Sequence, residues 1–190
     1  MQVLRAADRA AVPWKNGGGI TREVAVSPPG STLANFDWRV SMAEIAAAGP
    51  FSVFAGVDRR MAVLQGRLAL FIDGQAPLTL SRESAAVSFP GEVPVFAEPL
   101  DSLVTDLNVM TRRGRCSAAL TRCAERGSLA LAPGTGMRLL VARCDLTVRS
   151  GPVAMALAPL DALRTGNDAL RIAARDAGAA AFDLIEIHFR

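Results

Sequence analysis

Residues 61–74 read MAVLQGRLALFIDG. Two apolar runs, Met61–Leu64 and Leu68–Ile72, lie on either side of a turn centred on Gly66, and a second turn at 73–74 follows directly. Short apolar runs separated by a glycine-containing turn are typical of a β-hairpin. The stretch therefore predicts two adjacent antiparallel strands.

The same alternation of short apolar runs and turns fills most of the chain on both sides of this stretch. The further expected strands are Ile20–Ser27, Phe36–Ile45, Leu78–Leu80, Ala85–Phe89, Val93–Ala97, Leu103–Met110, Ser128–Leu131, Met137–Cys144, Asp145–Val148, Val153–Leu157, Ala169–Ala174 and Ala181–Phe189. The segment Cys116–Glu125 fits a short helix or an irregular strand, and Pro159–Thr165 predicts a short helical turn. Many short strands about 8–12 residues apart favour a sandwich or barrel, so the predicted fold class is all-β. Two series of strands joined near residues 111–127 indicate a duplicated β-domain.

Composition narrows the possible partners. Of the 190 residues, 51% are hydrophobic and 21% are charged, which is the balance of a folded globular protein. The formal net charge of +3 comes from scattered arginines, and the densest basic cluster, Arg112 to Arg115, has no aromatic neighbours that could stack on bases. We therefore expect no nucleic-acid partner. No apolar run approaches the roughly 20 residues of a membrane span, and residues 1–5 lack a signal-peptide pattern, so we expect no membrane association and a cytoplasmic location.

The cysteines and the histidine make a metal or cofactor site unexpected. Cys116, Cys123 and Cys144 are odd in number and lack C-x-x-C spacing, which indicates free thiols in a reducing compartment. The single histidine, His188, cannot provide both a catalytic triad and a metal site, and the usual zinc sites need several His or Cys ligands. A metal held by carboxylates alone stays open, but no clustered acidic motif indicates one. We expect no metal and no other cofactor.

The most unusual polar stretch is PWKNGGG, residues 13–19. The chain contains twenty arginines and one lysine, Lys15, which lies in this stretch. Because lysine carries a compact charge where arginine carries a planar fork, the choice indicates a place that a guanidinium does not fit. A glycine-rich turn also lets backbone N–H groups approach an anion, although the Walker spacing is absent. The alternatives are chance retention of one lysine and a strained turn that merely enters a strand.

A second stretch, Phe36–Ala43, combines polar and apolar residues on one expected strand. A period of two places Asp37, Arg39 and Ser41 on one face of that strand. Arg39 therefore either faces solvent or lines a cavity, and the sequence leaves both open.

Two further stretches raise the same question. Asp58 lies beside Arg59 and Arg60, where it either orients a guanidinium or caps a turn. Asp106 and Asn108 face the same way on another expected strand, and a carboxylate with an amide needs partners if the strand is buried. The alternative for Asp106 and Asn108 is that both face solvent.

Together these stretches resemble the HutD/Ves family of bacterial proteins. The resemblance rests on PWKNGGG with Thr21-Arg22-Glu23 and continues in Trp38–Ser41, Gly49–Ser52, Gly56–Arg59, Asp106–Met110 and Arg112–Gly114. These matches follow one another in order over residues 1–115. Residues 116–190 contain no motif that can be named and agree only in length and β character.

The resemblance implies a cupin (RmlC-like) β-barrel, duplicated within the chain as a bicupin. Residues 1–115 would form the first barrel, and residues 116–190 a degenerate second half packed on it. Some members accompany the histidine-utilization pathway and are thought to bind one of its metabolites, with urocanate and N-formylglutamate as anionic candidates, while others carry a stress-related label. Metal-binding cupins use histidine and glutamate ligands that this chain lacks at the matching positions, which implies a metal-free cavity.

The leading hypothesis is a metal-free binding protein for a small anionic metabolite, acting as a regulator. The predicted ligand-binding residues are Lys15, Asn16, Thr21, Arg39, Arg59, Asp106 and Asn108. The two arginines would hold a carboxylate through parallel charge-assisted hydrogen bonds. The lysine and the neighbouring amide would close one end, and the carboxyl–amide pair on the later strand would select a donor at the other.

Two other function classes stay open at this stage. An enzyme would use Lys15 as a base or Schiff-base former if burial lowers its pKa, or Asp106 as a general base. An interaction module would present an edge strand or an apolar patch to a transcription factor or to a second copy, so a homodimer also remains open.

Overall fold

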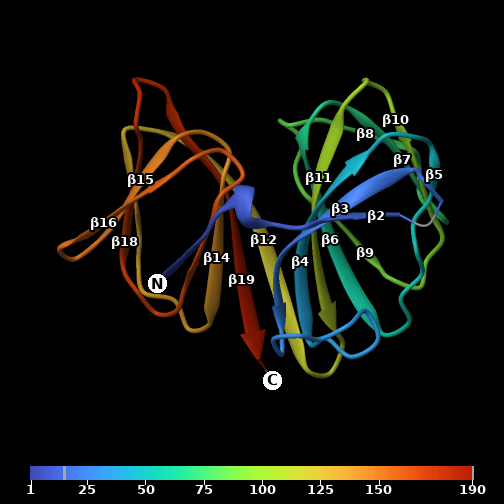
Figure 1. Ribbon diagram of the computed structural model, residues 1–190, viewed down its shortest axis with the longest axis horizontal. Helices are drawn as coiled ribbons and strands as arrows, with labels where there is room; N and C mark the ends of the chain where they lie inside the picture. Colours follow the sequence, from blue (N-terminus) through green and yellow to red (C-terminus); the bar gives the residue numbers. More distant parts are fainter. Residues whose placement is uncertain (15, 190) are drawn as a thin grey trace. The chain divides into compact units, whose positions relative to one another are not determined.

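The computed structural model describes residues 1–14 and 16–189, and these form two compact units. The N-terminal unit is Arg9–Ser117, and the C-terminal unit combines Met1–Asp8 with Ala118–Phe189. Both consist of β-strands (Figure 1), and the one helix in the described part of the chain is the 3-10 turn η1 (Ala6–Asp8). The all-β prediction is confirmed. No helix in those residues is long and apolar enough to cross a membrane.

The N-terminal unit contains two antiparallel sheets, here called the long sheet and the short sheet. The long sheet runs, in spatial order, β2 (Ala11–Pro13), β3 (Gly19–Ser27), β4 (Trp38–Ile45), β11 (Val104–Arg112), β6 (Val57–Gln65) and β9 (Val87–Pro90). The short sheet runs β5 (Gly49–Pro50), β10 (Val95–Pro99), β7 (Leu68–Ile72) and β8 (Leu78–Leu80). β11, in the middle of the long sheet, is buried on both faces along almost its whole length.

The predicted hairpin at Gly66 is wrong in its pairing, although both of its strands exist. β6 pairs with β11 and β9 in the long sheet, whereas β7 pairs with β10 and β8 in the short sheet. The turn at Gly66 is therefore a corner that carries the chain from one sheet to the other. Local sequence shows where a chain turns, but the partner of each strand depends on residues far along the chain.

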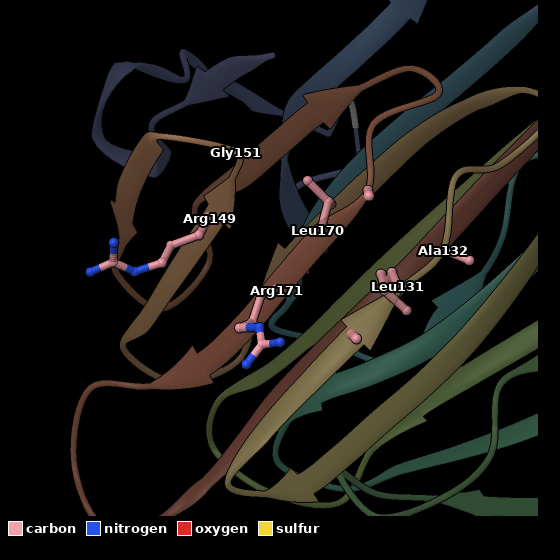
Figure 2. A pocket seen from close by; sticks show the side chains of 8 residues that line it. Leu131, Ala132, Arg149, Gly151, Leu170 and Arg171 are labelled. Carbon is pink, nitrogen blue, oxygen red and sulfur yellow. The ribbon is translucent and has the colours of Figure 1, made fainter.

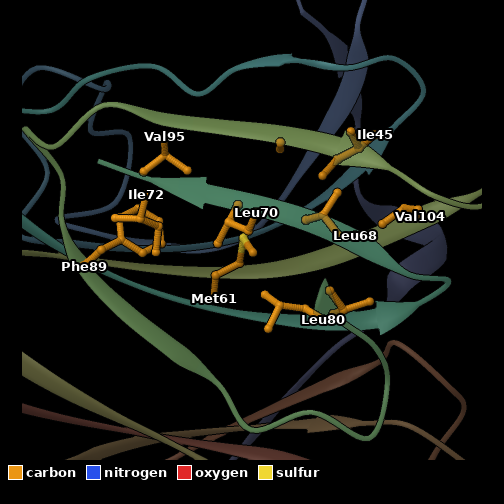
Figure 3. Close-up of a cluster of buried hydrophobic side chains, with 11 residues drawn as sticks. Ile45, Met61, Leu68, Leu70, Ile72, Leu80, Phe89, Val95 and Val104 are labelled. Carbon is orange, nitrogen blue, oxygen red and sulfur yellow. The ribbon is translucent and has the colours of Figure 1, made fainter. Parts of the chain in front are cut away.

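The core of the N-terminal unit lies between its two sheets. The long sheet contributes residues such as Met61 and Val104, and the short sheet contributes Leu70 and Val95 (Figure 3). Burial alternates along β7 and β10 with a period of two, because successive side chains of a strand point to opposite faces. Removing this apolar surface from water is the main favourable contribution to the stability of the unit.

The C-terminal unit repeats this two-sheet plan. One sheet runs β1 (Gln2–Leu4), β17 (Ala162–Thr165), β14 (Met137–Ala142), β19 (Ala179–Phe189) and β12 (Cys116–Arg126). The other runs β13 (Ser128–Leu131), β18 (Leu170–Ala174), β15 (Leu146–Ser150) and β16 (Val153–Leu157). Side chains of both sheets, among them Leu140, Leu146 and Phe182, form its core.

Two local expectations differ from the structure, and a third that the sequence left open is decided by it. The first eight residues belong with the C-terminal unit, because β1 pairs with β17, whereas the sequence placed them in a first domain of residues 1–115. Cys116–Glu125, for which helix and strand were open, lies in strand β12. The predicted helical turn at Pro159–Thr165 is wrong, since residues 162–165 form β17 between β14 and β1. Pairing with strands distant in sequence overrides weak local propensity.

Each unit is thus a pair of antiparallel sheets with an apolar interior, which is a cupin-type jelly roll. The fold class expected from the resemblance is confirmed. The sheets of each unit are separate hydrogen-bonded ladders, so the cupin architecture appears as a sandwich with a filled core.

Substitution of Gly66 tests whether this turn is a corner between the two sheets. Its φ is +74°, and a Cβ there would overlap the carbonyl oxygen of Leu103. Gly74 has a similar φ of +76° with nothing within 4 Å of such a Cβ. We expect Gly74→Ala to cost about 1 kcal/mol, the penalty of a left-handed backbone, and Gly66→Ala to cost about 2–4 kcal/mol because the clash is added. Urea unfolding followed by circular dichroism measures both, and equal losses would contradict the corner assignment.

Candidate functional site

The glycine-rich turn of residues 13–19 connects β2 to β3 at the edge of the long sheet. Lys15, the residue that drew attention to it, lies outside the described residues. The turn is closed by a hydrogen bond from Trp14 N to Gly19 O of 2.9 Å. A Cβ at Gly19 would overlap the carbonyl oxygen of Glu44 and press on the Trp14 ring, which explains why this position is glycine.

Two predicted site residues help to build this turn. The Asn16 Oδ1 accepts a hydrogen bond from the Gly18 N–H at 3.0 Å. The Thr21 Oγ1 accepts one from the Trp14 indole Nε1–H at 2.7 Å. Both side chains therefore have a structural role in shaping the entrance to β3.

The central feature of the site is a polar group on the interior face of the long sheet. Asp106 and Asn108 lie on β11, two residues apart, so they share a face with Met110. Met110 lies directly opposite Arg39 of β4 on one side and Arg59 of β6 on the other. The structure thus brings four of the predicted side chains onto one face of three adjacent strands.

Arg59 is enclosed almost completely. The residue is 6% exposed. Its Nη1 donates a hydrogen bond to the Ser52 carbonyl oxygen at 3.2 Å, and its Nε donates one to Asn108 Oδ1 at 3.4 Å. The guanidinium carbon lies 5.0–5.8 Å from the ring centres of three aromatic residues, Phe51, Phe54 and Phe89. Contacts of a cation with ring faces partly replace the water that burial removes.

The electrostatic state of Arg59 follows from this environment. Burial lowers the pKa of Arg59 to about 10, Asp106 opposes this shift, and Arg39 adds to it. The guanidinium therefore stays charged at neutral pH. No carboxylate of the described residues lies within ion-pair distance of it, so this buried cation is held by dipoles and rings alone.

Arg39 differs from Arg59 in having a carboxylate partner. Its Nε donates to Glu23 Oε2 at 2.9 Å, and its Nη1 donates to Ser41 Oγ at 3.3 Å. The side chain is 16% exposed and that of Glu23 is 43% exposed. The Arg39–Glu23 pair is thus the more accessible end of the polar group, and of the two possibilities that the sequence left open, Arg39 lines the interior.

Asp106 is the most deeply buried member of the polar group. It is 1% exposed, and its Oδ1 accepts a hydrogen bond from the Ala43 N–H at 3.1 Å. Burial raises the pKa of Asp106 to about 7, while the nearby Arg59 and the Ala43 N–H limit the rise. A carboxyl that changes charge near neutral pH, next to a cation that does not, is typical of functional sites.

The interior beside this polar group is filled rather than hollow. The space is occupied by Met61, which lies directly opposite Asn108, and by Leu68, Leu70 and neighbouring aliphatic side chains (Figure 3). The space that the cupin resemblance predicts as an open cavity is therefore occupied here by polar side chains and aliphatic core residues. A ligand that reaches Arg59 must replace the contacts that Arg59 makes now.

Two surface depressions lie elsewhere. One, of about 530 Å³ in the C-terminal unit, includes Leu131, Leu170, Arg149 and Arg171 in its lining (Figure 2). Arg149 of β15 and Arg171 of β18 are directly opposite each other. The second, of about 450 Å³, lies at the exposed side of the short sheet and includes Phe71 and Phe96. Neither contains a residue of the predicted site.

Sequence reasoning missed several parts of the polar group. Glu23 and the rings of Phe51, Phe54 and Phe89 were not singled out as partners, although Glu23 alternates with Thr21 on β3. Asp58 does not orient its neighbour Arg59 but accepts a hydrogen bond from Arg113 Nε at 2.7 Å. In the described part of the chain, no group of three or more His, Cys, Asp and Glu side chains is placed to hold a metal ion.

With this geometry in place, comparison with known proteins identifies the chain. The family model described as HutD matches residues 6–182. The chain belongs to the HutD family. The resemblance stated from the motifs is thereby confirmed.

HutD-family relatives match over part of the chain. It is 40% identical over 121 residues to an uncharacterized 21.2 kDa protein in the hutC 3′ region of Pseudomonas putida, a match that covers 63% of each protein. It is 40% identical over 114 residues to Protein Ves of Cronobacter sakazakii, covering 60% of this chain and 61% of the relative. The aligned part thus spans less than two thirds of these relatives.

Solved structures match over nearly the whole chain. A conserved protein of unknown function from Pseudomonas aeruginosa PAO1 has a TM-score of 0.88 and 30% identity, covering 98% of this chain and 97% of that one. HutD from Pseudomonas fluorescens SBW25, formate condition, has a TM-score of 0.83 and 27% identity, covering 100% and 98%. A cupin 2 conserved barrel domain protein from Leptotrichia buccalis, at 10% identity with a TM-score of 0.58 over 94% and 92%, shares the fold alone.

The ionisation of Asp106 predicts a pH dependence of stability. Since its pKa is raised to about 7 in the folded chain and is about 3.9 when unfolded, the folded state holds the proton more tightly. The free energy of unfolding contributed by Asp106 therefore falls as pH rises from about 4 to 7, by at most about 4 kcal/mol, and levels off above about pH 8. We expect Asp106→Asn, whose amide oxygen can still accept the Ala43 N–H, to gain stability relative to the native chain across this window.

Urea unfolding at pH 5, 6, 7 and 8 measures that difference. Asp101→Asn is the matched control, because Arg67 lowers the pKa of the exposed Asp101 carboxyl and the difference should stay constant from pH 5 to 8. A constant difference for Asp106→Asn as well would show that this carboxyl ionises at an ordinary pH in the folded chain.

Proposed function

We propose that this chain is a metal-free binding protein for a small anionic metabolite of the urocanate or N-formylglutamate type, acting as a regulator of histidine utilization or as a stress-related accessory protein. The single observation that carries the proposal is the buried guanidinium of Arg59, which has no carboxylate partner among the described residues. Membership of the HutD family and a relative named for the hutC region support an association with histidine utilization.

Arg59 suits a carboxylate for reasons of charge and shape. A guanidinium presents parallel N–H donors that match the two oxygens of a carboxylate. In the present structure its donors contact only neutral acceptors, the Ser52 carbonyl and the Asn108 amide. If an anion replaced these two acceptors, the guanidinium would face a full negative charge instead of two dipoles. The low local dielectric would strengthen the attraction between the guanidinium and the anion.

The remaining polar side chains would read the rest of the ligand. Arg39, with its accessible Glu23 partner, lies at the outer end and would take a second carboxylate oxygen or a second carboxylate. Asn108, released from Arg59, and the carboxyl of Asp106 would read an amide or imidazole N–H. A few such bonds in a water-poor site are compatible with micromolar binding, about 8 kcal/mol.

An enzyme acting on the same class of compound is the second candidate, and the ionisation of Asp106 favours it. A buried carboxyl with a pKa of about 7 has the balance of basicity and protonation that a general base needs at neutral pH. Release of formate from N-formylglutamate, at a rate that Asp106→Asn abolishes, would support this candidate. Recovery of the compound unchanged after binding would favour the regulator.

The binding proposal is tested by calorimetric titration with N-formylglutamate and with urocanate. We expect the native chain to bind one of them and Arg59→Gln to weaken binding at least about 30-fold, corresponding to roughly 2 kcal/mol for a buried charge-assisted pair. The matched control is Arg60→Gln, because Arg60 is the next residue of β6 and points to the other face of the sheet. Equal affinity for both variants, or no heat with either compound, would contradict the proposal.

A further inference from the structure

The polar group of the N-terminal unit leaves one carboxyl without an ion pair. Arg39 is bonded to Glu23, and Arg59 is bonded to neutral groups. Among residues 1–14 and 16–189, Asp106 accepts a hydrogen bond only from the Ala43 N–H, and no arginine lies within 4 Å of its carboxylate oxygens. It is buried in the same interior, on the strand between those that carry the two arginines.

The charge on Asp106 therefore depends on the field of Arg59 rather than on direct contact. Burial favours the neutral carboxyl, and the nearby cation favours the carboxylate. An anion bound to Arg59 would cancel that cation's field and add its own repulsion. Both effects act in the same direction, toward the protonated carboxyl.

We propose that the site binds its anionic ligand together with one proton, which is taken up by the Asp106 carboxylate as the anion engages Arg59. The inference rests on the proposed function, because it requires an anion at that guanidinium. The negative charge that the ligand brings is balanced by the proton, so the buried interior gains no net charge. By linkage, the proton and the anion strengthen each other's binding equally.

The other charged groups that face this interior do not carry the effect. On β4 the charge is that of Arg39, which is already paired, and on β3 it is that of its partner Glu23, which is 43% exposed. β9 contributes the ring of Phe89, and the short sheet contributes aliphatic side chains. Asp106 is thus the buried acid of the described residues whose ionisation an anion at Arg59 changes most.

The experiment is calorimetric titration of the native chain with N-formylglutamate, whose carboxylates stay ionised above about pH 6. Titration in PIPES and in Bis-Tris, which both buffer between pH 6 and 7 and differ in ionisation enthalpy, counts the protons taken up. We expect an uptake of about half a proton per ligand at pH 7, since the Asp106 carboxyl is about half ionised there, and almost none at pH 6. Above pH 7 the dissociation constant should rise by up to about tenfold per pH unit.

Two variants assign the proton to its residue. Asp106→Asn keeps the size of the side chain and an oxygen for the Ala43 N–H, so we expect it to bind N-formylglutamate with no proton uptake and a dissociation constant that does not change from pH 6 to 8.5. Asp101→Asn is the control, because the Asp101 carboxyl is paired with Arg67 away from this interior, and it should keep the native proton uptake. Circular dichroism confirms that both variants are folded.

The possible failures are distinct. Binding by the native chain with no proton uptake and no pH dependence overturns this inference and leaves the proposed function standing. The same result follows if Asp106→Asn keeps the native pH dependence. Absence of binding of N-formylglutamate and of urocanate at every pH from 6 to 8.5 overturns both.

Discussion

A guanidinium without a carboxylate, enclosed in the interior of a β-sandwich, is the constraint on which the site depends. Arg59 remains charged because three aromatic rings, a backbone carbonyl and the Asn108 amide together replace its water. Such an arrangement costs desolvation energy that no ion pair returns. Under the proposed function, an incoming anion would satisfy this guanidinium better than the neutral acceptors that it contacts now.

The polar side chains share the interior of the N-terminal sandwich with apolar ones, since Met61 lies opposite Asn108 and Val63 lies opposite Asp106. β11 has a special role because it is buried on both faces and lies between the strands that carry the two arginines. Its alternation puts Asp106, Asn108 and Met110 toward the interior. A shift of one residue in its register would send all three to the opposite face, so the long sheet must hold this register for the site to exist.

Family membership and fold give different information about this chain. The HutD family model, matching residues 6–182, shows what the chain is related to, and the cupin fold shows how two sheets can enclose a site. Neither determines a ligand. The ligand class that we propose rests on the charges in the interior, where Arg39 has Glu23 as a partner and Arg59 lies near Asp106, whose pKa is raised to about 7.

The sequence by itself determined most of the β-strands, the turns and the family, and it named four of the side chains that share the interior face while leaving their exposure open, because alternation with a period of two decides which residues of a strand point together but not which face is buried. It did not determine that β6 and β7 join different sheets, that β1 pairs with β17, or that Asn16 and Thr21 serve the turn. Only the tertiary structure decided that Arg39 is paired with Glu23 whereas Arg59 lies among three aromatic rings. The physical reason is that burial, pairing and pKa depend on neighbours brought together from distant strands, and a local pattern contains no information about them.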